Sequence, residues 1–344
     1  MRAMLSVVLE ERRVPLVSPV RNARGQWSER VLLQVRVRAA GGEAVGEAAP
    51  LPGHTADTLD AARKTLREMS WDGLGPLLDE PKALLAELAR RTKGSASARF
   101  AVQSALLSLV AARREVPLAG VMAELLGTRP APFEVAAWIE GDDAEALLAG
   151  GRRAVEQGHR TLKFKVGRDL DRELATARAL RRAVGDAVRL RFDANGALGE
   201  GSGVDFLRAL ASLRPELVEE PGPPAFVDAA AALVPVGLDE SLTVRSAPEV
   251  EALLARGVVR ALVLKPMALG LGACLHWCRF AARYDVPVIV SHLLGGPREM
   301  DVAESLAAAA GGPLAHGLGH HRVLAALKEP PRPARRRPRG PPWA

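Results

Sequence analysis

Two lysines lie close together in a short apolar segment near the middle of the chain. Residues 160–166 read R-T-L-K-F-K-V, a pattern typical of a buried strand. Because side chains alternate along a strand, Lys163 and Lys165 point to one face and Phe164 to the other. Two neighbouring ammonium groups repel each other unless an anion lies opposite them. A solvated edge strand is the alternative, so this segment predicts chemistry only together with charged residues further along the chain.

Such charged residues recur at a regular spacing. From Lys165, the steps to Asp193, Glu219, Asp239 and Lys265 are 28, 26, 20 and 26 residues, each about one strand and one helix. A single carboxylate of this kind is more simply explained as a helix cap or a loop ion pair. Charged groups at the carboxyl ends of successive barrel strands converge at one mouth, where such barrels hold their active sites. The spacing therefore predicts one common site.

The residue types indicate which chemistry this site performs. Three carboxylates without His or Cys suit Mg²⁺, which prefers hard oxygen ligands, and Mn²⁺ can substitute for it. Without a cation, the three carboxylates would repel one another or take up protons. A lysine made less basic by burial and by neighbouring cations can act as a general base at neutral pH. A cation on the substrate carboxylate would stabilise the enediolate that forms when the α-proton leaves.

The elements that position these residues alternate between strands and helices. The expected strands are 134–139, 161–166, 188–193, 216–219, 235–239, 261–265, 287–291 and 313–316. The expected helices are 144–157, 170–184, 204–213, 224–233, 248–256, 271–284 and 301–309. This α/β pattern predicts a closed parallel (β/α)8-type barrel. An open doubly wound sheet is the alternative, but no glycine-rich phosphate turn follows the first strand.

The segments on either side of the barrel have a different texture. Strands are expected at 4–9, 31–37 and 44–48, with a polar connection at 19–30, and helices at 56–91 and 97–114. We therefore expect an α+β capping domain at 1–125 and a barrel at 126–322. The Pro/Arg-rich tail, 323–344, is expected to be disordered, with a basic interaction tail as the alternative.

The composition excludes several classes of function. The formal charge is +7, but five arginines lie in the last fifteen residues, and +2 remains without them. Nucleic-acid binding by the folded part is therefore not expected. We find no apolar stretch long enough to span a membrane and no secretory leader. The two cysteines form no disulfide framework, which suits a reducing compartment, so a cytoplasmic protein is expected.

The charged motifs resemble those of a known family. K-F-K (163–165), D-A-N (193–195), E-E-P (219–221), D-E-S (239–241) and L-K-P (264–266) are similar to the enolase superfamily, in its muconate-lactonizing-enzyme-like branch. Within that branch, G-E-A-A-P-L-P-G-H-T (46–55) most resembles the o-succinylbenzoate synthases of menaquinone synthesis. The resemblance implies a modified (β/α)7β barrel with a capping domain, Mg²⁺, and a small-molecule carboxylate substrate that is dehydrated. It is compatible with a homo-oligomer.

The resemblance also implies a role for each motif residue. Lys165 would remove the α-proton, Lys163 would assist it, and Lys265 would act from across the intermediate. Asp193, Glu219 and Asp239 would hold the metal, with Glu219 rather than its neighbour as the ligand. The residues expected to orient the ligands or to bind substrate are Asn195, Glu220, Glu240, Ser291, His292, Gly295 and Arg24. Residues 21–26 occupy the place of a loop that closes over the substrate.

Two segments depart from the synthase pattern and leave other reactions open. They are S-H-L-L-G-G (291–296) and G-L-G-H-H (317–321), at positions that touch the distal part of the substrate. The alternatives are epimerisation of a dipeptide or an N-acylamino acid and cycloisomerisation of the muconate type. One observation opposes a dipeptide substrate: no acidic D-x-D motif follows the eighth strand, where it would bind the substrate's ammonium group. A binding-only descendant is a further alternative, although every lysine is present. His54 and His316 are expected to be structural or solvated.

Overall fold

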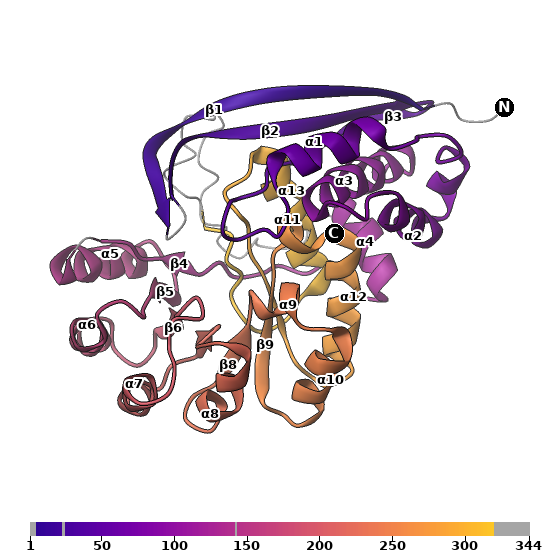
Figure 1. Cartoon of the computed structure of the whole chain (residues 1–344). Helices are drawn as coiled ribbons and strands as arrows, with labels where there is room; N and C mark the ends of the chain where they lie inside the picture. Colours follow the sequence, from indigo (N-terminus) through magenta and orange to yellow (C-terminus); the bar gives the residue numbers. More distant parts are fainter. Residues whose placement is uncertain (1–4, 23–24, 142, 320–344) are drawn as a thin grey trace.

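The computed structural model describes residues 5–22, 25–141 and 143–319. The chain begins with an antiparallel sheet of three strands in the order β1 (Ser6–Asn22), β2 (Gly25–Ala39) and β3 (Gly42–Ala48). Figure 1 shows this sheet along one side of the molecule and the barrel strands on the other. β1 and β2 pair as far as Asn22 and Gly25. The polar connection expected at 19–30 therefore belongs largely to the two strands, which pair up to Asn22 and again from Gly25.

Helices pack behind this sheet and complete the part of the chain that we call the cap (β1–β3 and α1–α4). They are α1 (Leu59–Glu68), the 3-10 turn η1 (Pro76–Asp79), α2 (Pro81–Arg91), α3 (Ala96–Arg113) and α4 (Leu118–Leu126). α3 is buried along most of its length and lies against β3. A Cβ atom at Gly46 would lie 1.8 Å from the carbonyl oxygen of Ala101, so only glycine permits this close approach.

A parallel sheet of seven strands forms the barrel, in the order β10-β9-β8-β7-β6-β5-β4. Its strands are β4 (Ala137–Trp138), β5 (Thr161–Lys165), β6 (Arg189–Asp193), β7 (Leu217–Glu219), β8 (Val236–Leu238), β9 (Val259–Leu264) and β10 (Val288–Val290). The expected eighth strand is reduced to single bridges, Val135 to His316 and Ser291 to Gly317. These bridges join the two edge strands, so the curled sheet closes as a (β/α)7β barrel.

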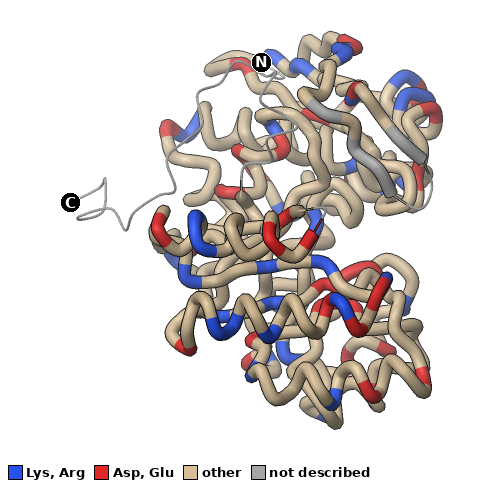
Figure 2. The backbone as a smooth tube through the Cα atoms, turned by 90° about the vertical axis from the view of Figure 1, so that its left-hand side faces the viewer, with Lys and Arg blue, Asp and Glu red and all other residues tan. Residues whose placement is uncertain are grey.

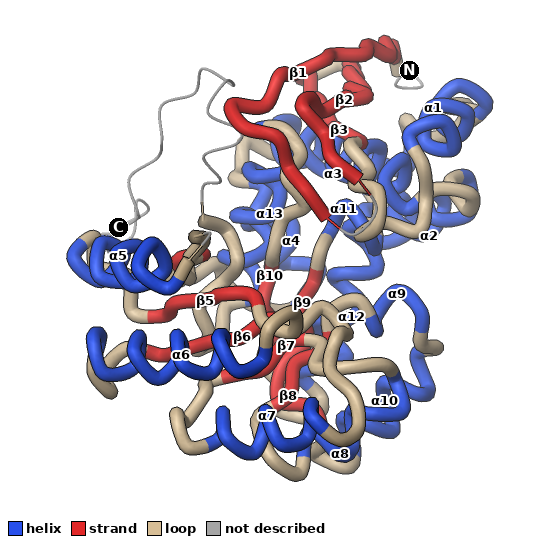
Figure 3. Tube along the Cα trace, turned by 60° about the vertical axis from the view of Figure 1, so that its left-hand side comes forward, coloured by secondary structure: helices blue, strands red, loops and turns tan. Residues whose placement is uncertain are grey.

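Helices surround the barrel strands (Figure 3). They are α5 (Ala144–Glu156), α6 (Leu170–Val184), α7 (Ser202–Ala211), η2 (Pro224–Phe226), α8 (Val227–Ala231), α9 (Ser241–Val244), α10 (Ala247–Ala255), α11 (Pro266–Leu269), α12 (Leu271–Ala282) and α13 (Pro297–Ala310). The alternation of strand and helix predicted from the sequence is confirmed, and α9 and α11 are additional short helices. Within the described residues, no helix combines the length and the apolar character that a membrane span requires.

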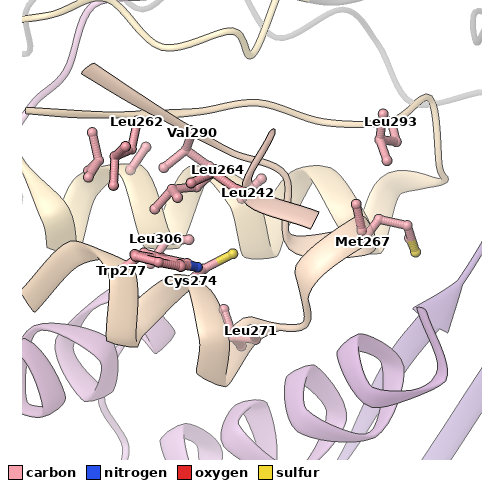
Figure 4. Packing of buried hydrophobic residues seen from close by; sticks show 14 of the residues in the cluster. Leu242, Leu262, Leu264, Met267, Leu271, Cys274, Trp277, Val290, Leu293 and Leu306 are labelled. Atoms are coloured by element: carbon pink, nitrogen blue, oxygen red, sulfur yellow. The ribbon is translucent and has the colours of Figure 1, made fainter. Parts of the chain in front are cut away.

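The hydrophobic core joins the barrel to the helices on its outside. Figure 4 shows Cys274 and Trp277 of α12 facing Leu264 and Val290 of the barrel. Both cysteines are free and buried, and burial raises the pKa of Cys278 to about 12. They are therefore unreactive core residues at neutral pH.

Charges of both signs are interspersed on the face of the molecule in Figure 2. Ion pairs between side chains near the surface include Arg36 with Glu43 and Arg208 with Asp205. The tail at 323–344, His320, His321 and the candidate residue Arg24 lie outside the described residues.

Candidate active site

Strand register brings the charged residues together at the carboxyl end of the barrel. Lys165 of β5 pairs with Asp193 of β6, and Asp193 pairs with Glu219 of β7. Asp239 follows directly after β8, and Lys265 follows directly after β9. The five groups therefore lie at the same level of one mouth, as their spacing predicted.

Lys163 lies between two of the buried carboxylates. Its Nζ atom is 3.0 Å from Oδ2 of Asp193 and 2.5 Å from Oε2 of Glu219. Burial by itself would lower the pKa of this lysine, but the charges of Asp193, Glu219 and Asp239 raise it above its ordinary value. Lys163 is therefore held as an ammonium group.

Lys265 likewise forms ion pairs with two carboxylates, on the other side of the mouth. Its Nζ atom is 2.6 Å from Oδ2 of Asp239 and 3.5 Å from Oε1 of Glu240. Burial opposes the charged form, but the two carboxylates outweigh it and raise the pKa of Lys265. In the sheet, β6, β7 and β8 separate the strand of Lys163 from the strand that precedes Lys265.

The neighbouring residues Glu219 and Glu220 point in different directions. Glu220 has a positive φ of 39°, and its carboxylate accepts hydrogen bonds from the backbone N–H groups of Asp239 and Ser241, at 2.9 and 3.0 Å. It also accepts one from the Ser241 hydroxyl, at 2.5 Å. Because these contacts occupy both of its oxygens, Glu220 positions the backbone of Asp239, while Glu219 faces the mouth.

Asn195 connects two carboxylates at the mouth through hydrogen bonds. It has a positive φ of 45°, and its backbone N–H donates to Oδ1 of Asp193 at 3.1 Å. Its side-chain amide donates to Oε1 of Glu240, also at 3.1 Å. Strained backbone of this kind persists where the surroundings hold it, and it gathers at functional sites.

The carboxylate cluster is short of hydrogen-bond donors. Among the described residues, Oε1 of Glu219 and Oε2 of Glu240 are buried without a hydrogen-bond partner, and Nη1 of Arg191 lies 3.7 Å from Oε1 of Glu219. Burial raises the pKa of Asp239 well above its usual range, although Lys265 opposes the shift. In the parts of the chain that the structure describes, no three acidic, His or Cys side chains are already gathered as a metal site, and the lysine ammonium groups lie against the carboxylates instead. Hard oxygen donors with unpartnered atoms nevertheless fit Mg²⁺ by type.

Lys165 differs from the other two lysines because its side chain is exposed. Its Nζ atom lies 6.0 Å from the ring centroid of Trp138, which ends β4. The burial expected of this lysine is therefore not observed, and its role as the base stays a prediction. Trp138 was missed in the sequence, although it stands at the same end of the first strand as the residues that were found.

The turn after β10 contains three further candidates. Ser291 donates to the carbonyl oxygen of Gly317 at 3.2 Å, and Nε2 of His292 is 3.1 Å from the carbonyl oxygen of Gly319. Gly295 donates its N–H to Glu299 at 2.6 Å. The first two hydrogen bonds join the turn to the segment that closes the barrel, and the third joins it to α13. Contact of Ser291, His292 and Gly295 with substrate stays a prediction.

His54 reaches the site from the cap. Its Nδ1 atom lies 3.8 Å from Oε1 of Glu240, and it lines a small pocket together with Asp239, Glu240 and Lys265. His54 was expected to be structural or solvated, and its approach to the site was not predictable because its partners lie more than 180 residues further along the chain. His316 is instead fully buried, as expected of a structural residue. Burial lowers the pKa of His316 to about 4, and its Nδ1 accepts from the N–H of Val290.

Comparisons with known proteins agree with this architecture. Residues 146–336 match the family described as enolase C-terminal domain-like. The chain is 30% identical over 214 residues to an L-Ala-D/L-Glu epimerase of Bacillus subtilis, a match that covers 60% of this chain and 57% of that protein. The chain thus spans little more than half the length of that curated relative.

Two further relatives extend the comparison. An o-succinylbenzoate synthase of Thermosynechococcus vestitus is 29% identical over 273 residues, or 74% of each chain. The solved structure of a dipeptide epimerase from Methylococcus capsulatus, complexed with Mg and the dipeptide L-Arg-D-Lys, has a TM-score of 0.75 at 25% identity. That match covers 90% of this chain and 88% of the other.

Proposed function

The chain belongs to the enolase C-terminal domain-like family, and on that premise we propose that it removes and returns the α-proton of an N-acylated amino acid with a free carboxylate. Dipeptides are one class of such substrates. The enzyme is then an epimerase or racemase. The similarity to curated dipeptide epimerases of Bacillus subtilis and Methylococcus capsulatus supports this choice.

One geometric observation carries the proposal: amines approach the mouth from two sides. Lys163 and Lys165 come from β5, and Lys265 comes from the end of β9, beyond the three intervening strands of the sheet. Inversion at a carbon atom requires a proton to leave one face and return to the other. We assign Nζ of Lys165 to one face and Nζ of Lys265 to the opposite face, with Lys163 binding the substrate carboxylate.

The metal assignment follows the donor types. Asp193, Glu219 and Asp239 would hold Mg²⁺, while Asn195, Glu220 and Glu240 orient them through their hydrogen bonds at the mouth. The cation would supply positive charge beside the substrate carboxylate, where negative charge develops as the α-proton leaves.

A second candidate is o-succinylbenzoate synthase. The similarity to the Thermosynechococcus vestitus synthase covers 74% of each chain, more than the match to the Bacillus subtilis epimerase. In that reaction Lys165 would act as base and then as acid on one face, and Lys265 would contribute only its positive charge. The two candidates therefore differ in the role of Lys265.

The test is stereospecific proton exchange in D₂O with Mg²⁺, followed by NMR on dipeptides and N-succinylamino acids. For an epimerase, Lys265→Ala should lose epimerisation by at least ~10²-fold, yet still exchange the α-proton of the one stereoisomer that faces Lys165. Lys165→Ala should show the converse. The exposed Lys64 on α1 provides the control, and Lys64→Ala should behave as the parent.

Other outcomes decide against the proposal. Loss of exchange for both stereoisomers in Lys265→Ala would show that Lys265 is not the second acid and base. Rapid loss of the ultraviolet absorbance of the synthase's cyclohexadiene substrate, without exchange in dipeptides or N-succinylamino acids, would establish the synthase instead.

A further inference from the structure

A second group of buried charges lies away from the barrel mouth, between the cap and the barrel. It consists of Arg30 on β2, Glu47 on β3 and Glu299 in the first turn of α13. Their exposed fractions are 4%, 0% and 1%. The proposed reaction uses none of the three. We call them the interface cluster.

The two carboxylates of the interface cluster bind the backbone of one turn, residues 293–296, which joins β10 to α13. Glu299 accepts from the N–H groups of Leu293 and Gly295, at 2.9 and 2.6 Å. Glu47 accepts from the N–H group of Gly296. Three of the four backbone N–H groups of this turn therefore donate hydrogen bonds to carboxylates of the interface cluster.

Arg30 binds carbonyl oxygens on both sides of the interface. It donates to Leu294 at 2.9 Å and to Leu293 at 3.5 Å in the turn. In the cap it donates to Pro50 at 3.1 Å and also to Ala49. One guanidinium thus fastens the segment after β3 to the turn after β10.

The glycines of this turn leave room for the carboxylates. A Cβ atom at Gly295 would lie 2.4 Å from Oε2 of Glu299, and one at Gly296 would lie 2.4 Å from Oε2 of Glu47. Any side chain at either position would displace a carboxylate. The G-G pair at 295–296 and the two glutamates are therefore one fitted unit, although Gly296 and Glu47 are 249 residues apart.

The charges of the interface cluster do not balance when both carboxylates are ionised. Burial raises the pKa of Glu47 to about 7, and the hydrogen bond from Gly296 only partly opposes it. Burial also raises the pKa of Glu299. The groups that face Glu47 are Arg30 and Gln34 on β2 and Arg298 and Glu299 on α13.

We propose that Glu47 is a positioning residue, which holds the turn 293–296 and thereby places Ser291 and His292 at the barrel mouth. Docking of the cap and binding of substrate are then coupled through this turn. The part of the inference that concerns substrate rests on the proposed function. The part that concerns the turn does not.

The experiment compares Glu47→Ala and Glu47→Gln with Glu43→Gln, a matched control on the exposed end of the same strand. Hydrogen exchange measures the amides of Leu293, Gly295 and Gly296, and dipeptide or N-succinylamino acid turnover gives kcat and KM from pH 6 to pH 8.5. Glu47→Ala should speed exchange at these amides at least tenfold while the amides of β5–β7 stay unchanged. Its KM should rise at least tenfold, with kcat within about threefold of the parent.

Glu47→Gln keeps an acceptor for Gly296 but cannot ionise. Its KM should therefore stay flat over this pH range, whereas the KM of the parent should rise as the pH passes 7. Turn amides and KM within twofold of the parent in Glu47→Ala would overturn the inference, as would an unchanged pH profile in Glu47→Gln. If the parent turns over none of the substrates, the proposed function fails, and amide exchange alone decides the role of Glu47.

Discussion

The molecule contains two buried acidic clusters with different partners. At the barrel mouth, Asp193, Glu219 and Asp239 face the amines of Lys163 and Lys265, and no described residue donates a hydrogen bond to Oε1 of Glu219. In the interface cluster, the carboxylates accept from backbone N–H groups of one turn. Backbone donors cannot move away from a carboxylate, but lysine side chains can. The first cluster is therefore suited to exchange partners with a cation and a substrate, and the second to hold a structure in place.

The largest effect that tests this comparison is the pH dependence of stability in the interface cluster. The pKa of Glu47 is raised to about 7 from 4.5, so its stabilising contribution is complete below pH 4.5 and is lost as the pH rises through 7. The full shift corresponds to about 3 kcal/mol. Between pH 4.5 and pH 8, the free energy of unfolding of the parent, measured with urea, should fall by about 3 kcal/mol more than that of Glu47→Gln. If the free energy of unfolding changes equally with pH in the parent and in Glu47→Gln, Glu47 does not carry a raised pKa, and the proposed difference between the two clusters fails.

A slightly smaller effect concerns metal affinity at the barrel mouth. Glu219→Gln should weaken Mg²⁺ binding by at least ~100-fold, or about 2.7 kcal/mol. Replacing a residue that only supports a metal ligand already lowers the metal affinity by about 10–100-fold, and Glu219 is assigned as a ligand itself. Stability without metal should fall as well, because the variant loses the buried ion pair between Glu219 and the Nζ atom of Lys163. Isothermal calorimetry measures the affinity. An unchanged affinity would show that Glu219 is not a ligand.

The smallest effect separates Glu220 from its neighbour. Glu220→Gln replaces an acceptor by a donor among two backbone N–H groups and a hydroxyl, so it should lower the free energy of unfolding without metal by about 2 kcal/mol. Glu219→Gln is the matched control, with the same chemical change one residue earlier. A loss of Mg²⁺ affinity in Glu220→Gln as large as that in Glu219→Gln would contradict the different roles of these glutamates.

The residues of the candidate site were predictable where strand geometry alone decides their place. Lys163, Asp193 and Glu219 were found because side chains alternate along strands and because parallel strands end at one edge. The same reasoning placed Asp239 and Lys265. It applies equally to Trp138, which was missed because a lone aromatic residue does not stand out as a charged one does.

Other features were not predictable because they depend on segments far apart in the chain. The approach of His54 to Glu240 and the reduction of the eighth strand to bridges depend on contacts between distant segments. The exposure of Lys165 cannot be read from the pattern of its own strand. The ends of β1 and β2 were assigned to a polar connection because their arginine-rich composition does not show a pairing that only the partner strand supplies.

The amino-acid sequence by itself determined the barrel, its charged mouth and the family, since each follows from periodic local patterns. Tertiary structure alone decided that Glu47 and Glu299 share one turn and one arginine. The motif at 46–55 and the glycines at 295–296 were visible separately, but nothing in either segment indicates the other. Their association arises from long-range packing, in which each glycine leaves room for a carboxylate that a distant part of the chain supplies.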